Sequence, residues 1–365
     1  MRYGVVTTSN RVPAPGPVRS LGRIGLWGAP GSGKTTYLAA LQIAVNRAQD
    51  RNLMIFGVDD SSTDFLVENT AMLTRERRFP AATALQQQLS WVLQLQTEVP
   101  VRRPLRRTVM TPVPLELNID LLDAPGRQFD SVPGLTQEDG GRPQPRSGGA
   151  LGFDDDDDDE DDGDGGDGAG SVGTEDSLMD SMAGCDGLLL LFDPIREWQR
   201  GDAYNYFQGT LLRIAQRRMA ERTRPGSKLP HYVAVCVTKF DEPDVYRRAR
   251  INGYRSFATE DPAMFPRVRE EDAERFFAEL CREASRGDAD LVRNALHRYF
   301  EPDRVRFFVT SAIGFYLGKK STRFQEQDFQ NAVQEPSGEF RIRGPIHPIN
   351  VVEPLVWLGQ SLAAR

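Results

Sequence analysis

The sequence predicts an α/β fold in which helices cover both faces of a mostly parallel sheet. Short apolar runs of strand type recur along the chain, helical patterns of apolar residues separate most of them, and a glycine-rich turn joins the first run to the first helical pattern. This alternation favours parallel strands, because each helix carries the chain back across the sheet. Five runs are expected to form the sheet, at residues 24–27, 115–122, 188–192, 232–237 and 305–309.

The first run leads into the glycine-rich segment GAPGSGKTT, residues 28–36, and a helical pattern follows it. Glycines at the turn positions let several backbone N–H groups face one anion, while a lysine adds positive charge and a threonine hydroxyl is a ligand for Mg²⁺. A helix that starts here adds its free amides and the positive end of its dipole. The segment therefore predicts a nucleotide-phosphate site that contains Gly28, Gly31, Ser32, Gly33, Lys34, Thr35 and Thr36.

The second run ends in the segment DAPG, residues 123–126. Asp123 is expected to hold Mg²⁺ through a water, and the Gly126 amide to reach the γ-phosphate. An aspartate at a strand end is also a common turn residue, so the segment gains weight only from its place between the other motifs.

The segment TKFD, residues 238–241, follows the run at 232–237. A carboxylate at Asp241 can accept hydrogen bonds from N1–H and the exocyclic amine of guanine, whereas adenine presents an acceptor at N1. Lys239 is expected to lay its stem along the base, and Thr238 to tie this turn to the phosphate loop. The alternative interpretation is an ordinary turn that an aspartate caps.

The last run leads into Thr310, Ser311 and Ala312, whose backbone amides are expected to meet the guanine O6. Beyond it, the apolar pattern in residues 348–365 predicts a terminal core helix.

In this order, GAPGSGKT, DAPG, TKFD and TSA resemble the guanine-nucleotide motifs of the Ras-like, translation-factor (TRAFAC) class of P-loop GTPases, over residues 21–132 and 176–315. More loosely, FPAAT at 79–83 and NVVEPL at 350–355 resemble the bacterial double-GTPase (DO-GTPase) group, whose members are implicated in signalling and defence. The resemblance implies a P-loop NTPase fold that binds GTP or GDP with Mg²⁺ and hydrolyses GTP. It also implies a protein effector or a second GTPase as partner.

The resemblance points to Thr83 as the switch threonine that closes over Mg²⁺ and the γ-phosphate, because Phe79-Pro80 gives the polar loop a rigid start. Its competitors are Thr70, Thr74, Thr108 and Thr111.

Ras-type enzymes place a water-orienting glutamine directly after the glycine of the third motif, but Arg127 stands there and Gln128 follows it. Orientation of water by Gln128, an internal arginine finger from Arg127 or Arg78, and a group supplied by a partner all stay open. So do two other functions, a GTP-bound scaffold that does not hydrolyse and a P-loop ATPase or kinase in which TKFD is a coincidence.

The predicted organisation is a GTPase domain interrupted by two insertions. Residues 130–175 are dominated by Gly, Asp, Pro and Ser, and so few apolar groups predict disorder. Helical periodicity predicts that the second insertion is a helical subdomain or lid. The expected segments are a tail at 1–20, GTPase parts at 21–129 and 176–241, the insertions at 130–175 and 242–303, and the GTPase end with its helix at 304–365.

The net charge of −7 is concentrated in residues 154–167, which carry eleven acidic groups, and removing these from the total leaves a remainder of +4. That remainder is too weakly basic to predict a nucleic-acid partner. The acidic run is expected to be a solvated insert, with masking of the arginines at 102–107 as the functional alternative.

No apolar run approaches the length of a membrane span, and no signal-peptide core is present. With three widely spaced cysteines, this predicts a cytoplasmic protein with reduced thiols.

Overall fold

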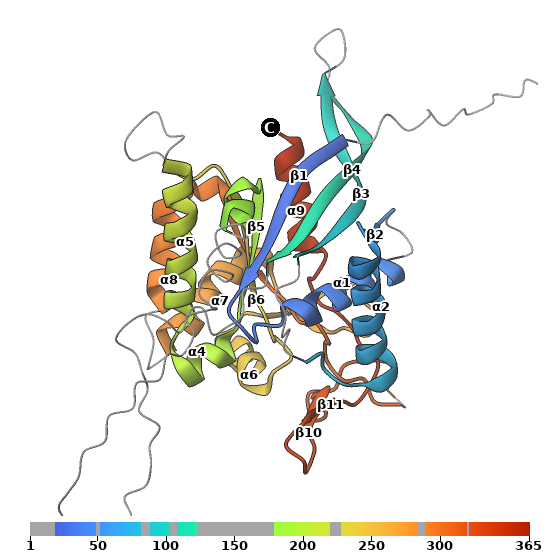
Figure 1. The fold of residues 1–365 in the computed structure, drawn as a ribbon. Coiled ribbons are helices and arrows are strands. Elements are labelled where there is room, and N and C mark those ends of the chain that lie inside the picture. Colours follow the sequence, from blue (N-terminus) through green and yellow to red (C-terminus); the bar gives the residue numbers. More distant parts are fainter. Residues whose placement is uncertain are drawn as a thin grey trace, which may run out of the picture.

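A computed structural model of the 365-residue chain describes residues 19–48, 52–81, 88–102, 108–122, 179–219, 228–283, 289–319 and 321–365. Within these ranges, seven strands form one sheet in the order β2-β3-β4-β1-β5-β6-β9 (Figure 1). In chain order the strands are β1 (Arg19–Gly28), β2 (Met54–Gly57), β3 (Gln88–Arg102), β4 (Thr108–Leu122), β5 (Gly187–Phe192), β6 (Tyr232–Val237) and β9 (Val305–Val309). All five predicted runs lie in this sheet.

The pairing of the central strands is parallel. β1 pairs with β4 and β5, and β6 pairs with β5 and β9. Each residue of β5 is buried, and its side chains alternate between two cores, with Leu188 and Leu190 in one and Leu189 and Leu191 in the other. A continuous apolar run is what a parallel strand covered on both faces requires, so the predicted mostly parallel sheet is confirmed.

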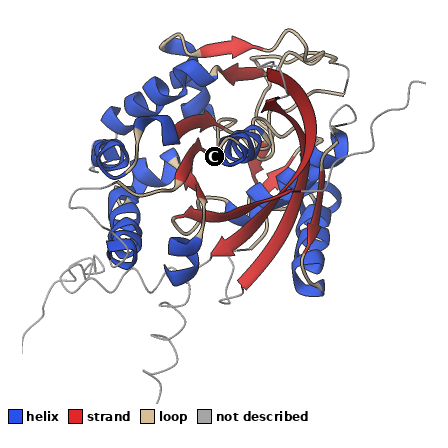
Figure 2. Cartoon of the chain, turned by 90° about the horizontal axis from the view of Figure 1, so that it is seen from above, coloured by secondary structure: helices blue, strands red, loops and turns tan. Residues whose placement is uncertain are grey.

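Helices cover both faces of the sheet, as the alternation predicted (Figures 1 and 2). One core is shared by α4 (Pro194–Arg200), α5 (Ala203–Met219), α6 (Pro243–Ile251), α7 (Glu270–Glu283) and α8 (Ala289–Tyr299). The other is shared by α1 (Lys34–Arg47), α2 (Asp60–Ala71) and α9 (Glu353–Ala363). Figure 2 shows that the sheet curves around the C-terminal helix α9. Among the described residues, no helix is both long enough and apolar enough to cross a membrane.

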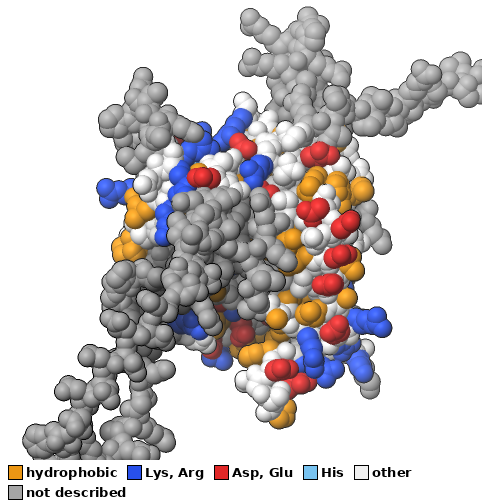
Figure 3. Space-filling model, in the orientation of Figure 1, with side chains coloured by type: hydrophobic (Ala, Val, Ile, Leu, Met, Phe, Trp, Pro, Cys, Tyr) orange, Lys and Arg blue, Asp and Glu red, His pale blue; other side chains and the backbone are white. Residues whose placement is uncertain are grey.

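Two antiparallel strands, β2 and β3, extend the sheet beyond β4. The edge strand β2 was not predicted, because Met54 and Phe56 on it are exposed and four residues give no clear period. It is followed by α2 and a short π-helix, η1 (Met72–Glu76). Exposed hydrophobic and acidic side chains gather on the side of the molecule where Figure 1 places α2 (Figure 3).

The segment at 242–303 contains α6, α7 and α8, and it leads into η3 (Pro302–Arg304). It also contains a hairpin of β7 (Arg255–Phe257) and β8 (Pro266–Val268) that helical periodicity did not indicate. Phe276 and Phe277 of α7 belong to the same core as Phe307 of β9. These helices are therefore part of the cover of the main sheet. Cys185, Cys236 and Cys281 are buried free thiols, and burial raises the pKa of Cys185 to about 12.

Between β9 and α9 the chain leaves the sheet and forms a second hairpin, β10 (Ala332–Gln334) with β11 (Phe340–Ile342). A small core joins this excursion to α1, with Ala39 and Ile43 on the helix and Ile313, Ile342 and Ile346 on the excursion. The excursion thus packs beside the helix that follows the glycine-rich loop.

Candidate nucleotide site

The glycine-rich loop connects β1, which ends at Gly28, to α1, which begins at Lys34. Gly31 and Gly33 have φ angles of 75° and 93°, in the left-handed region that favours glycine. Gly28 is fixed for a different reason, because a Cβ there would lie 2.8 Å from the backbone oxygen of Leu191 on the neighbouring strand. All three glycines of the predicted phosphate site are therefore required by the backbone.

The start of α1 presents polar groups to this loop. The N-cap of α1 is Gly33, which has no side chain that could accept a hydrogen bond from the helix. The first N–H groups of an α-helix have no acceptor within the helix itself. The Lys34 ammonium is buried and donates to the carbonyl oxygens of Gly28 at 2.9 Å and Ala29 at 3.4 Å. The hydroxyl of Ser32 is buried without a hydrogen-bond partner among the described residues. Positive charge, helix amides and an orphaned hydroxyl fit an anionic ligand at this loop.

The turn after β6 is held by the end of β5. Both the Thr238 N–H and its hydroxyl donate to the carbonyl oxygen of Phe192, at 2.8 and 3.1 Å. The bonds from Thr238 that the structure shows thus go to β5, the strand beside β6, and its tie to the phosphate loop stays a prediction. Lys239 adopts a left-handed φ of 58°, and its ammonium lies 2.6 Å from Asp193.

Asp241 is buried, at 8% exposed, and accepts a hydrogen bond from the Ser311 hydroxyl. That hydroxyl in turn accepts from the N–H of Gly314 at 2.8 Å. Burial raises the pKa of Asp241 to about 6, and the bond from Ser311 acts in the opposite direction. The structure thus brings TKFD and TSA together at the carboxyl ends of β6 and β9.

Ser311 contributes differently from the expectation. Its backbone N–H donates to the Ile349 carbonyl oxygen at 3.0 Å, so this amide is already used in a bridge between the two segments. The side chain, which the motif did not single out, is what contacts Asp241. Ala312 is the next residue and is partly buried.

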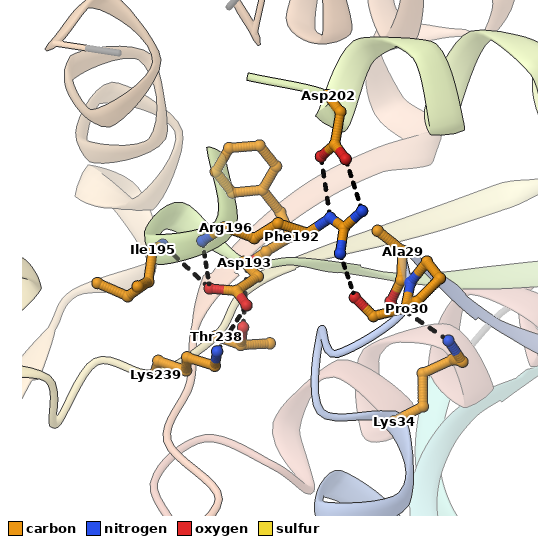
Figure 4. A network of polar contacts seen from close by, with 10 residues as sticks. All are labelled: Ala29, Pro30, Lys34, Phe192, Asp193, Ile195, Arg196, Asp202, Thr238 and Lys239. Atoms are coloured by element: carbon orange, nitrogen blue, oxygen red, sulfur yellow. Dashed lines mark hydrogen bonds and ion pairs between the residues drawn. The ribbon is translucent and has the colours of Figure 1, made fainter. Parts of the chain in front are cut away.

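Sequence reasoning missed two further residues, Asp193 and Arg196, at the junction of β5 and α4 (Figure 4). Asp193 caps α4 by accepting from the N–H groups of Ile195 and Arg196, and it also pairs with Lys239. The Arg196 guanidinium donates to the Pro30 carbonyl oxygen of the glycine-rich loop at 2.9 Å. An Asp-Pro step after an apolar run is a helix-start signal and could have located α4, but no spacing rule gives the contact with Pro30.

The predicted Mg²⁺ side of the site lies mostly outside the described residues. This holds for Thr83, Asp123, Gly126 and Gln128, whereas Thr35 lies in the first turn of α1. Of the competitors to Thr83, Thr70 is in α2, Thr74 is in η1 and donates to the Thr70 carbonyl oxygen at 2.7 Å, and Thr108 and Thr111 are in β4. The described part of the chain holds no cluster of three or more His, Cys, Asp or Glu side chains that could bind a metal ion.

No protein-family model matches the chain, and no curated protein matches it. Among solved structures it is similar to Sup35 complexed with GMPPNP, with 11% identity and a TM-score of 0.29, over 81% of this chain and 38% of that one. It is also similar to the S. cerevisiae Ski7 GTPase-like domain bound to GTP, with 12% identity and a TM-score of 0.35, over 94% and 50% of the two chains. A protein from Thermus thermophilus is 14% identical, with a TM-score of 0.25, over 80% and 37%. The chain therefore spans half or less of the length of each of these proteins.

Proposed function

We propose that this chain is a TRAFAC-class P-loop GTPase, a Mg²⁺-dependent switch that binds GTP and hydrolyses it slowly. The observation that carries the proposal is the buried Asp241 carboxylate, held by Ser311 at the same end of the sheet as the glycine-rich loop. Ligands of parallel α/β sheets bind beyond the carboxyl ends of the strands, where β1, β6 and β9 each end in a polar motif.

Asp241 gives the site its preference among purines. Guanine donates from N1 and from its exocyclic amine, so it satisfies both oxygens of a carboxylate. Adenine presents a lone pair at N1 and would leave the buried carboxylate with the bond from Ser311 but none from the base, which costs about 1–3 kcal/mol. Ser311 keeps the carboxylate turned toward its loop, and Lys239, fixed by Asp193, lies beside it.

The phosphates would lie against the amides of the loop and of the first turn of α1, with the Lys34 charge opposite them. Thr35, Asp123 and Thr83 are the residues that we propose hold Mg²⁺, directly or through water. When bound, the ion neutralises charge on the β and γ oxygens. Gln128 is our candidate for orienting the attacking water.

The test is calorimetric titration of the full chain with GDP, GTP and ATP, with and without Mg²⁺. We expect binding of both guanine nucleotides, with ATP weaker by about 5- to 150-fold, because adenine donates no hydrogen bond from N1 to the Asp241 carboxylate. Asp241→Ala should remove this preference, while the matched change Asp244→Ala, an exposed carboxylate on α6, should leave it intact. Equal binding of ATP and GTP by the wild-type chain would refute the guanine assignment.

A second candidate is a scaffold that stays bound to GTP and does not hydrolyse it. Arg127, at the position where Ras-type enzymes carry glutamine, favours this alternative. Single-turnover release of phosphate from bound GTP separates the two, since any rate above uncatalysed hydrolysis excludes the scaffold. The looser resemblance to double GTPases supports a protein effector or a second GTPase as partner in bacterial signalling or defence.

A further inference from the structure

Arg196 reaches the glycine-rich loop from a different part of the sheet. It lies in the first turn of α4, directly after β5, and β5 pairs with both β1 and β6. Its Nη1 donates to the Pro30 carbonyl oxygen at 2.9 Å (Figure 4). This contact joins the loop to an element whose sequence carries no phosphate motif.

The guanidinium is held in place on its other edge. Its Nε and Nη2 donate to the two carboxylate oxygens of Asp202, at 2.9 and 2.5 Å, and the group lies 4.9 Å from the ring centre of Tyr206. The Arg196 side chain is only 12% exposed. A bidentate pair with a carboxylate fixes the plane of a guanidinium, which a lysine ammonium cannot reproduce.

The contact has a consequence for the opposite side of the loop. No peptide bond in the described residues is cis, and in a trans peptide the C=O and the following N–H point in opposite directions. When the Pro30 carbonyl faces Arg196, the Gly31 N–H therefore faces away from it. Phosphate loops bind anions through such N–H groups, so the contact fixes a donor before the ligand arrives.

The same short segment also controls the base side of the site. Asp193, three residues before Arg196, pairs with Lys239 of TKFD while it caps α4. Arg196 therefore acts from a turn that is itself anchored to the base loop, and its position is tied to both halves of the site.

We propose that Arg196 is a positioning residue for the nucleotide phosphates, which acts through the Pro30–Gly31 peptide group and is itself oriented by Asp202. This inference rests on the proposed function, because it requires a phosphate ligand at the loop. It predicts that Arg196 strengthens the binding of a nucleotide, through its phosphates, and leaves the binding of the nucleoside unchanged.

The test compares GDP with guanosine, each measured by competition against a labelled guanine nucleotide. We expect Arg196→Gln to lower the affinity for GDP by about tenfold, which is the scale of one charge-assisted hydrogen bond. The affinity for guanosine should change by less than about twofold. Arg196→Lys should give an intermediate loss of GDP affinity, since an ammonium keeps the positive charge but cannot pair with both oxygens of Asp202. The control is Arg200→Gln, an exposed arginine at the end of the same helix, which should change neither ligand.

Three results would overturn the inference. GDP affinity that is unchanged in a folded Arg196→Gln chain shows that the contact with Pro30 has no effect on phosphates. Equal losses of GDP and guanosine show a general structural role, and the Arg196→Lys variant answers the same question if the glutamine variant does not fold. If the wild-type chain binds no guanine nucleotide at all, the proposed function fails as well, whereas the first two results leave it standing.

Discussion

Guanine affinity should fall as the pH is lowered from 7 to 5, because Asp241 must be ionised to accept two hydrogen bonds from the base. Burial raises the pKa of this carboxyl to about 6 in the free protein. The ionised fraction is then about 0.9 at pH 7 and about 0.1 at pH 5. Bound guanine favours the carboxylate, so a protonated site must release its proton first. The expected loss of affinity is about tenfold, or about 1.4 kcal/mol.

The ligand for this assay is guanosine, because the terminal phosphate of a nucleotide titrates near the same pH. Competition against a labelled guanine nucleotide at each pH gives the affinity. The Asp241→Asn variant is the control, since an amide has no charge to lose and its affinity, although weaker, should not vary over this range. A flat profile for the wild-type chain, or an equal slope in the variant, would refute the assignment of Asp241 to the base.

Three further predictions concern stability and charge. Asp241→Asn should stabilise the nucleotide-free chain at pH 7. Burial raises the pKa of this carboxyl from 3.8 to about 6, so the stability that it contributes at low pH is lost as the pH rises through 6. Urea unfolding at pH 7 should therefore show a free energy of unfolding that is higher in the variant by up to about 3 kcal/mol. Burial lowers the pKa of His231 to about 4. Its contribution to the free energy of unfolding, up to about 3 kcal/mol, is therefore present above pH 6.5 and is lost as the pH falls from 6.5 toward 4. In the same urea measurements, the stability of His231→Gln should depend less on pH than that of the wild-type chain. Lys34→Ala should lower GDP affinity by about a hundredfold, which calorimetry can check once thermal unfolding has shown that the variant folds.

Two strands at the centre of the sheet, β5 and β6, could be predicted because they are continuous apolar runs bounded by polar turns. Residues 188–192 and 233–237 have no polar residue that could face water, and burial on both faces is the stable place for them. β2 lacks this signal, since Met54 and Phe56 are exposed and its position at the edge depends on β3 beside it. An edge strand is defined by its neighbour more than by its own residues.

The candidate site shows the same division. Glycine positions in the loop follow from local backbone demands, so the requirement for Gly31 and Gly33 could be predicted from spacing alone. The acceptor that Thr238 contacts and the carbonyl that Arg196 reaches depend instead on which strand ends lie side by side. A sequence motif predicts which side chain is present and on which element it lies. The group that this side chain contacts depends on the order of strands in the sheet.

The excursion between β9 and α9 links Asp241 to the segment that precedes the predicted switch threonine. At one end, Ser311 contacts Asp241 and bridges to Ile349. At the other, the Ile342 N–H donates to the Arg77 carbonyl oxygen at 2.9 Å, and Arg78 bridges to Arg341. Arg77 itself has a left-handed φ of 58° directly after the π-helix η1, a local conformation that contacts from β11 help to hold. The chain that leads toward Thr83 therefore begins at a point that the same excursion holds, and this excursion also contacts Asp241.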